Sequence, residues 1–317
     1  MTNSSQSTAT TVVVTVLNEE KTVAALLSAL SSQTLTPKEV IIVDGGSTDS
    51  TLSSLQSLQK TTKKFRLRVL KKKGNRSVGR NTAIAAAKTN WIAITDAGCV
   101  PELDWLMQLH QTQHRSQAPV IAGYYRAEPA TPFEEAVVPY TLVMPDRVNE
   151  FSFLPATRSM LLKRSIWKQL GGFDEALPDN EDFAFAKQLQ RTNTEIAFSR
   201  NAVVLWQPRS SLGAFIHMIF RFARGDAQAG IIRAKVLLIF FRYLVAGWIF
   251  LAAIGSSNMV LLITLVLGGC TYILWAIQKN YQYVTTGWYW LPVLQVTSDL
   301  AVLAGSFAGI FRGLKNI

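Results

Sequence analysis

Cysteine is scarce in this sequence, which has only Cys99 and Cys270 among its 317 residues. The two lie in unrelated contexts, so the sequence excludes a disulfide framework and a cysteine-based zinc site, both of which need clustered cysteines. The histidines also lack the spacing of metal ligands; they are His110, His114 and His217. This composition fits a protein of a reducing compartment.

Charged residues are few, at 17% of the chain, and negative charge is the scarcer sign. The 21 Asp and Glu residues stand against 32 Lys and Arg, which gives a formal net charge of +11. A basic excess favours an anionic partner such as a nucleic acid, a nucleotide or an anionic membrane surface. The lysine-rich loop that begins at Lys71–Lys73 lacks the interleaved aromatic residues of a nucleic-acid-binding surface. We therefore expect no nucleic acid among the partners.

The N-terminus lacks an apolar segment. Residues 1–11 are polar and rich in Ser and Thr, which predicts a disordered tail and no cleaved signal peptide. We therefore expect the folded part that follows to stay in the cytoplasm.

Four apolar runs alternate with helical patterns in the first hundred residues. The runs, which we interpret as buried strands, are residues 12–17, 40–43, 65–70 and 91–94. The segments between them place apolar residues at helical spacing, as in Val23, Leu26, Leu27 and Leu30. This alternation predicts an α/β fold with a mostly parallel, twisted, Rossmann-like sheet flanked by helices.

The last 80 residues or so are mostly apolar. Residues 236–255 and 259–277 are each long enough to cross a bilayer and are joined by a very short connection. A third stretch, 288–311, contains Asp299 and is expected either to span the membrane or to lie in its interface. The alternative is a buried hairpin in a soluble protein, but soluble helices rarely run this long without charge. We predict a membrane domain over 236–317, with the basic residues before it on the cytoplasmic side.

Polar residues follow the predicted strands where a parallel sheet places its ligands. Glu19 follows the first strand, Asp44 the second and Asp96 the fourth, while Arg80 follows the lysine-rich loop. Because the carboxyl ends of parallel strands share one edge, these side chains should converge. Neither a P-loop nor a G-x-G-x-x-G fingerprint is present. The set suits a nucleotide whose diphosphate is held by a cation, and the oxygens of Asp96 suit Mg²⁺ or Mn²⁺.

Short motifs also follow one another in a specific order along residues 12–230. They are Val12–Glu20, Val43–Asp49, Gly79–Asn81, Thr95–Gly98, and Gly171–Glu175 followed by Glu181-Asp182. Each motif is weak by itself, but the ordered set resembles the motifs of family-2 glycosyltransferases, to which C-terminal membrane helices are a common addition. The resemblance implies an inverting GT-A domain over 12–230 that uses a nucleotide-sugar donor and usually a divalent metal.

The resemblance also implies which residues bind the donor. They are Thr15, Leu17, Glu19, Asp44, Arg80, Asp96, Arg221 and Arg224. The first four would line the nucleoside pocket, and Arg80 would reach the base or the phosphates. Asp96 would ligate the metal, and the last two would form a second cationic clamp. Processive members carry a Gln-x-x-Arg-Trp motif in that region, and its absence here favours the addition of one sugar.

For catalysis, the resemblance implies that Asp182, or less favourably Glu181, is the general base. Displacement at an anomeric carbon needs a carboxylate to take the proton of the acceptor hydroxyl. Two positions depart from the family pattern. Gly98 stands where a second metal carboxylate is expected, and Leu17 stands where an aromatic residue often stacks on the base. These departures bear on metal dependence and donor affinity, not on the fold.

Simpler structural interpretations exist for the same residues. Asp96 could cap a helix, Asp44 could form a turn in its Gly-Gly loop, and Glu181 with Asp182 could be a solvated helix start. For the whole chain, the sequence favours a membrane-anchored glycosyltransferase of the hexosyltransferase type. It would act at the cytoplasmic face on a lipid-linked or glycan hydroxyl, in polysaccharide or glycolipid synthesis. The rival hypothesis is a non-catalytic, glycosyltransferase-like membrane subunit that binds nucleotide or a partner enzyme.

Overall fold

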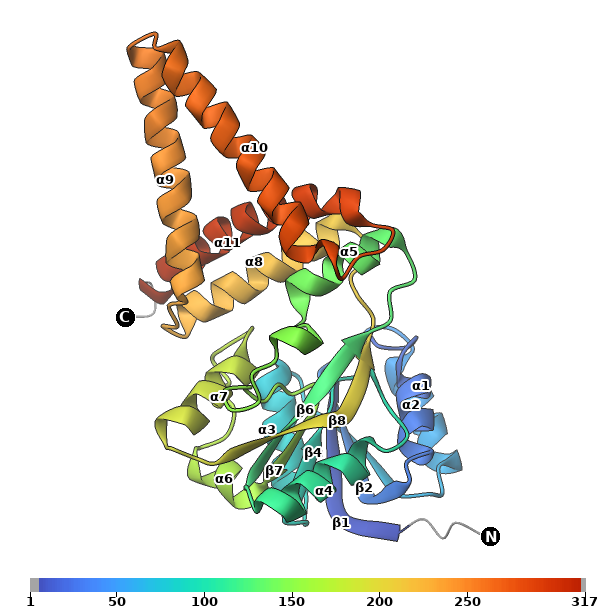
Figure 1. Ribbon diagram of the computed structural model, residues 1–317. Helices are drawn as coiled ribbons and strands as arrows, with labels where there is room; N and C mark the ends of the chain where they lie inside the picture. Colours follow the sequence, from blue (N-terminus) through green and yellow to red (C-terminus); the bar gives the residue numbers. More distant parts are fainter. Residues whose placement is uncertain (1–5, 315–317) are drawn as a thin grey trace. The chain divides into compact units, whose positions relative to one another are not determined.

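The computed structural model describes residues 6–314, which form two compact units (Figure 1). The first unit comprises the chain up to Glu128 together with Met144–Gln207, and the second comprises Pro129–Val143 together with the chain from Pro208. Strand β1 (Gln6–Val16) begins inside the segment predicted to be a disordered tail. Its first residues pair with the neighbouring strand from Leu35 onward, so the tail prediction is wrong from Gln6; residues 1–5 lie outside the described residues.

One eight-stranded sheet forms the centre of the first unit, in the order β3-β2-β1-β4-β7-β6-β8-β5. The further strands are β2 (Leu35–Asp44), β3 (Arg66–Lys71), β4 (Trp91–Ile94), β5 (Cys99–Pro101), β6 (Val120–Ala127), β7 (Met160–Lys163) and β8 (Ile196–Trp206). Strands β3, β2, β1 and β4 are parallel, as predicted. Strand β7 runs antiparallel to both β4 and β6, so the sheet as a whole is mixed.

Helices flank this sheet and bury the apolar stripes that the sequence predicts. They are α1 (Val23–Ser31), α2 (Thr51–Thr61), α3 (Arg76–Ala86), α4 (Trp105–Ser116), α6 (Arg164–Gln169) and α7 (Glu181–Arg191), with a short 3-10 helix η1 (Pro145–Arg147). In α3, Ala83 and Ile84 are fully buried and join a core cluster with Ile92, Phe173 and Phe185. Helices α3 and α7 therefore share a core, which fixes the start of each relative to the sheet.

The register of the parallel strands brings their carboxyl ends to one edge. Val16 pairs with Asp44, and Val13 pairs with Ile94. Glu19 and Asp96 follow these strands within a few residues, so both positions lie at the edge where the polar side chains were expected to converge.

The second unit consists of helices. They are α5 (Pro132–Thr141), α8 (Leu212–Gln228), α9 (Ala234–Gly255), α10 (Met259–Tyr281), the 3-10 helix η2 (Trp288–Trp290) and α11 (Leu291–Leu314). Within residues 6–314, three segments are long and apolar enough to cross a membrane, at residues 234–255, 259–281 and 288–311. Helices α9 and α10 form a hairpin with large apolar side chains exposed, such as Trp248 at 71%. Helices α5 and α8 belong to this unit, whereas the sequence grouped them with the glycosyltransferase-like domain.

Helix α11 lies alongside α8 and crosswise to the α9–α10 hairpin (Figure 1). The two helices approach closely at Gly305 and Gly309, where an added Cβ would lie 2.3 Å from the Phe220 carbonyl oxygen and 2.6 Å from that of Arg224. Asp299 of α11 is 1% exposed and accepts a 2.6 Å hydrogen bond from Arg242 of α9. Asp299 therefore forms a contact between helices α11 and α9.

Candidate active site

Helix α3 begins the site, and its first turn is fixed by local contacts. The Asn75 side chain caps the helix by accepting a 3.1 Å hydrogen bond from the Val78 backbone N–H. Gly79 then packs against β1 so closely that an added Cβ would lie 2.6 Å from the Cγ2 atom of Thr15. Only glycine allows this approach, which directs the next side chain, Arg80, along the edge of the sheet.

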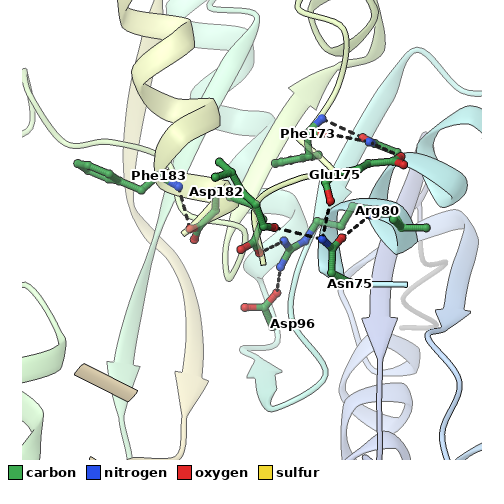
Figure 2. Close-up of polar contacts among 11 residues, drawn as sticks. Asn75, Arg80, Asp96, Phe173, Glu175, Asp182 and Phe183 are labelled. Atoms are coloured by element: carbon green, nitrogen blue, oxygen red, sulfur yellow. Dashed lines mark hydrogen bonds and ion pairs between the residues drawn. The ribbon is translucent and has the colours of Figure 1, made fainter. Parts of the chain in front are cut away.

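Arg80 connects two elements of the site that are distant in sequence (Figure 2). One terminal nitrogen donates to the Glu181 carboxylate at the start of α7, and the other donates to Asp96 Oδ1 at 2.8 Å. The Arg80 side chain is 2% exposed, as against 34% for Asp96. Burial alone would lower the pKa of Arg80, but Glu181, Asp96 and Asp182 raise it above its ordinary value, so the cation is permanent.

The loop that precedes α7 is held by α3. Asn81 donates to the Phe173 carbonyl oxygen at 2.8 Å and to Glu175 at 2.9 Å, and it accepts from the Phe173 N–H. Gly172 has a φ of +85°, and an added Cβ would lie 2.8 Å from Asn81 Oδ1. The motif Gly79-Arg-Asn81 is therefore hydrogen-bonded to the motif Gly171–Glu175, and this contact positions the start of α7.

Asp182 lies at the start of α7 and is half-buried. Its Oδ1 accepts a 2.8 Å hydrogen bond from the Phe183 N–H (Figure 2), and its Oδ2 has no hydrogen-bond partner within the described residues. Burial raises the pKa of Asp182, and the neighbouring Glu181 raises it further, while Arg80 opposes the shift. A carboxylate with a raised pKa and a free oxygen is a stronger proton acceptor than an ordinary aspartate. By contrast, Glu181 is 3% exposed and engaged by Arg80, so its oxygens are less available.

Asp96 is the candidate metal ligand, and it is already engaged by Arg80. Burial opposes ionisation of Asp96, but Arg80, Arg76 and Arg158 lower its pKa, so the side chain is an anion at neutral pH. Between residues 6 and 314, no group of three or more His, Cys, Asp or Glu side chains could hold a metal. Asp96 therefore fits a divalent cation only as a single carboxylate ligand, with diphosphate oxygens and water as the other ligands, as Mg²⁺ accepts in many nucleotide sites. At Gly98 an added Cβ would meet nothing within 4 Å, so the structure leaves room there for a second ligand that this sequence does not supply.

The residues predicted to line the nucleoside pocket occupy the same edge with different exposures. Leu17 is 55% exposed, whereas Asp44 is 3% exposed. Asp44 accepts hydrogen bonds from the N–H groups of Gly46 and Ser47 at 3.2–3.3 Å and from the Ser47 hydroxyl at 2.5 Å. Its carboxylate thus holds the turn after β2, as the simpler interpretation of this residue predicts. Glu19 accepts a 2.6 Å hydrogen bond from Thr22.

Arg221 and Arg224 lie in α8, which belongs to the second compact unit. The Arg224 guanidinium lies 5.8 Å from the centre of the Phe220 ring. Their role as a second cationic clamp stays a prediction.

Sequence reasoning assigned no donor or catalytic role to the Asn75 and Asn81 contacts or to Arg158. The signal for Asn81 was present, because it follows Arg80 directly within a recognised motif. From the sequence, Arg158 was expected only as the last residue of a segment, 139–158, that would line the acceptor entrance. It gave no local signal for a role at the donor, since it is one arginine before a short strand. Its position emerges only from the pairing of β7 with β4.

A family model for glycosyl transferase family 2 matches residues 11–169, about half of the chain. The chain belongs to glycosyl transferase family 2. The family-2 match includes Asp44, Arg80 and Asp96 but ends before Asp182, so the assignment of the base depends on the geometry described above.

Several known glycosyltransferases are similar to this family-2 member. Glycosyltransferase AglE of Haloferax volcanii is 21% identical over 217 residues, which cover 67% of this chain and 70% of that protein. Among solved structures, the mannosyltransferase PcManGT of Pyrobaculum calidifontis, in complex with GDP-Man and Mn²⁺, matches with a TM-score of 0.65 and 18% identity, covering 93% of this chain and 87% of that one. TarS 1–349 of S. aureus, in complex with UDP, matches with a TM-score of 0.50 and 18% identity, covering 97% and 92%. At these identities the structural matches establish the GT-A fold.

Proposed function

We propose that this family-2 glycosyltransferase is an inverting enzyme that moves one sugar, of the hexose type, from a nucleotide sugar to a hydroxyl acceptor. The observation that most supports this is Asp182: a half-buried carboxylate with a raised pKa beside the ion pairs of Arg80. Direct displacement requires a base at this place and inverts the anomeric centre, because the acceptor enters opposite the leaving group.

In the proposed reaction, Asp182 takes the proton of the acceptor hydroxyl while that oxygen bonds to the anomeric carbon. The bond from this carbon to the diphosphate breaks, and the diphosphate leaves with the electron pair. Arg80 and Glu181, which are buried against each other, position Asp96 and Asp182 relative to each other. The contact of Arg80 with the donor stays a prediction. A divalent cation held by Asp96 would supply positive charge to the departing diphosphate. The GDP-Man and Mn²⁺ bound to the mannosyltransferase PcManGT support such a donor and metal for this chain.

The membrane helices suggest the nature of the acceptor. A hairpin of α9 and α10 would hold the enzyme at the bilayer, where a lipid-linked acceptor is concentrated in two dimensions. Arg233 and Lys235 precede or begin α9, and Lys279 ends α10, whereas the connection at 256–258 has no charge. By the positive-inside rule, this distribution favours a cytoplasmic catalytic domain. We therefore propose a lipid-linked or glycan hydroxyl as acceptor, at the cytoplasmic face.

A single substitution tests the proposed reaction. Asp182→Asn keeps the shape of the side chain but cannot accept the proton, so we expect turnover to fall by about 10²–10⁴-fold while nucleotide binding persists. Glu195→Gln, an exposed carboxylate at the other end of the sheet, is the control. Nucleotide release from a panel of UDP-, GDP- and dTDP-sugars, with and without Mn²⁺, is the measurement. Wild-type rates in the Asp182→Asn enzyme would show that the base is another group.

The non-catalytic subunit remains the second candidate, because of Gly98. With one carboxylate where the family has two, the site resembles one whose metal chemistry has decayed. If the wild-type protein binds nucleotide but releases none from any donor of the panel, this candidate is favoured.

A further inference from the structure

Arg158 lies over two buried aromatic rings next to the candidate active site. Its guanidinium carbon is 5.4 Å from the centre of the Tyr125 ring and 5.1 Å from the centre of the Trp206 ring. Tyr125 is 8% exposed and Trp206 is 7% exposed, so both rings are fixed by packing. Stacking of this kind orients a guanidinium plane before any ligand arrives.

Strand pairing places Arg158 opposite Asp96. The antiparallel register of β4 and β7 pairs Ile94 with Met160, and two residues further along the two chains lie Asp96 and Arg158. Trp206, on which Arg158 stacks, pairs with Cys99, the neighbour of Gly98. Arg158 is thus in the same region as Gly98, the position from which the second metal carboxylate is missing, although no atom lies within 4 Å of an added Cβ there.

The N–H groups of Arg158 are available to a ligand. Among residues 9–311, no carboxylate forms an ion pair with Arg158 and no acceptor takes a hydrogen bond from it. An arginine has five N–H donors, and a guanidinium that stacks on its faces still presents these donors at its edge. Residues with such a combination of fixed orientation and unused donors bind carboxylate or phosphate.

The charges around Arg158 indicate which anion it meets. Three carboxylates, Asp96, Glu181 and Asp182, surround the one guanidinium of Arg80. The net charge of this cluster of four side chains is negative, so the cluster repels a diphosphate unless other cations are present. Arg158 is near enough to lower the pKa of both Asp96 and Asp182, so it supplies positive charge between the two.

We propose that Arg158 binds the diphosphate of the nucleotide-sugar donor and thereby replaces part of the charge that a metal held by two carboxylates would supply. The inference rests on the proposed function and adds the residue that receives the leaving group. Because a fixed arginine needs no metal, donor binding should persist in part when divalent cations are removed. The Arg158 N–H groups would then hold the diphosphate oxygens as the bond to the anomeric carbon breaks.

The test compares nucleoside diphosphates with nucleosides. Binding of UDP, GDP and dTDP, and of uridine, guanosine and thymidine, is measured by calorimetry on the full-length protein in detergent, with EDTA and with Mn²⁺. We expect Arg158→Gln to weaken binding of whichever nucleoside diphosphate the wild type binds by about 10- to 100-fold, which is the effect of losing a charge-assisted hydrogen-bonded pair. The affinity for the matching nucleoside should stay unchanged. Arg158→Lys, which keeps the charge but loses the planar donor set, should lie between. Arg66→Gln, at an exposed arginine on β3, is the matched control.

Each other outcome has a definite meaning. If Arg158→Gln and Arg158→Lys weaken nucleoside and nucleoside diphosphate equally, Arg158 only supports the fold of the pocket and the inference is wrong. Unchanged affinity for the nucleoside diphosphate also overturns the inference. So does a loss of affinity that is confined to a polyprenyl phosphate added in micelles, because Arg158 would then bind the acceptor. If the wild type binds no nucleoside diphosphate under either condition, the proposed function fails and this inference fails with it.

Discussion

Arg80 and Glu181 are 101 positions apart in sequence and form an ion pair from which solvent is excluded, with side chains 2% and 3% exposed. The pair joins α3 to the start of α7, which contains the proposed base. The second terminal nitrogen of Arg80 donates to Asp96. One buried guanidinium therefore sets the distance between the carboxylate proposed to hold the metal and the carboxylate proposed to take the proton.

Removing the Arg80 charge should destabilise the protein strongly. Arg80→Met leaves Glu181 buried without its partner, and breaking a buried ion pair in this way costs about 3–5 kcal/mol. For a protein of this size we expect the Tm in detergent to fall by on the order of 10 °C. Arg66→Met, at a side chain that is 74% exposed, should cost less than about 1 kcal/mol. Equal Tm values for the two variants would show that solvent reaches the Arg80 pair.

As the pH is lowered, the enzyme should lose activity at a higher pH than it would if its base were an aspartate with an ordinary pKa. Asp182 acts as a base only when ionised, and burial together with Glu181 raises its pKa, so protonation stops turnover at a pH above the usual value of about 4. Arg158 is among the cations that lower this pKa, so Arg158→Gln should move the acid limb of the kcat profile to still higher pH. Arg66→Gln should leave it in place. A shift toward lower pH in Arg158→Gln would contradict the assigned base.

Much of the fold follows from the sequence, because apolar runs such as 12–17 and 91–94 form strands wherever both faces of a sheet are covered. The antiparallel half of the sheet was harder to predict from the sequence. Strand β5 has three residues, too few for a periodic pattern, and β8 is one continuous strand between β6 and β5. In the site, sequence motifs identified Arg80 and Asp182. The ion pair between Arg80 and Glu181 could not be predicted, because residues 101 positions apart leave no local sequence pattern. The position of Arg158 beside Asp96 was missed for the same reason, since only strand register brings the two residues together.

Restoring a carboxylate at position 98 should strengthen metal binding. The site of Gly98 is open, so Gly98→Asp fits without displacing neighbours and adds a second hard oxygen ligand beside Asp96. We expect the Mn²⁺ concentration for half-maximal activity to fall by about 10-fold, since added ligand charge tightens such sites. Gly98→Asn has the same size without the charge and is the control. If both variants behave alike, or if neither changes the Mn²⁺ requirement, Asp96 is not a metal ligand.

The packing of α11 on α8 should depend on glycine at position 305. An added Cβ there would lie 2.3 Å from the Phe220 carbonyl oxygen, so Gly305→Ala forces the helices apart and costs about 1–3 kcal/mol. Gly268→Ala in α10 is a matched control, since its Cβ would meet nothing within 4 Å. Alanine favours helix over glycine, so the control should be neutral or slightly stabilising. Thermal unfolding in detergent compares the two, and a Tm for Gly305→Ala at or above that of the control would contradict close packing.

Helix α11 should lie in the membrane interface and leave the crossing to α9 and α10. It packs along α8, a helix with Arg221 and Arg224 in its middle, and such a helix does not cross a bilayer. Its apolar window is also 39% buried by protein, as against 6% for α9 and α10. Asp299 bonds to Arg242, which lies about two turns, or roughly 12 Å, into α9 and so near one surface.

Single cysteines, introduced in a Cys99→Ser, Cys270→Ser background, measure this topology in intact cells with a membrane-impermeant maleimide. Ser257→Cys in the α9–α10 connection should react from outside. Tyr289→Cys, just before α11, and a cysteine added after Ile317 should both stay protected until the membrane is permeabilised. Because a spanning helix has its ends on opposite sides, reaction of the C-terminal cysteine with protection of the one at position 289 would show that α11 crosses the bilayer.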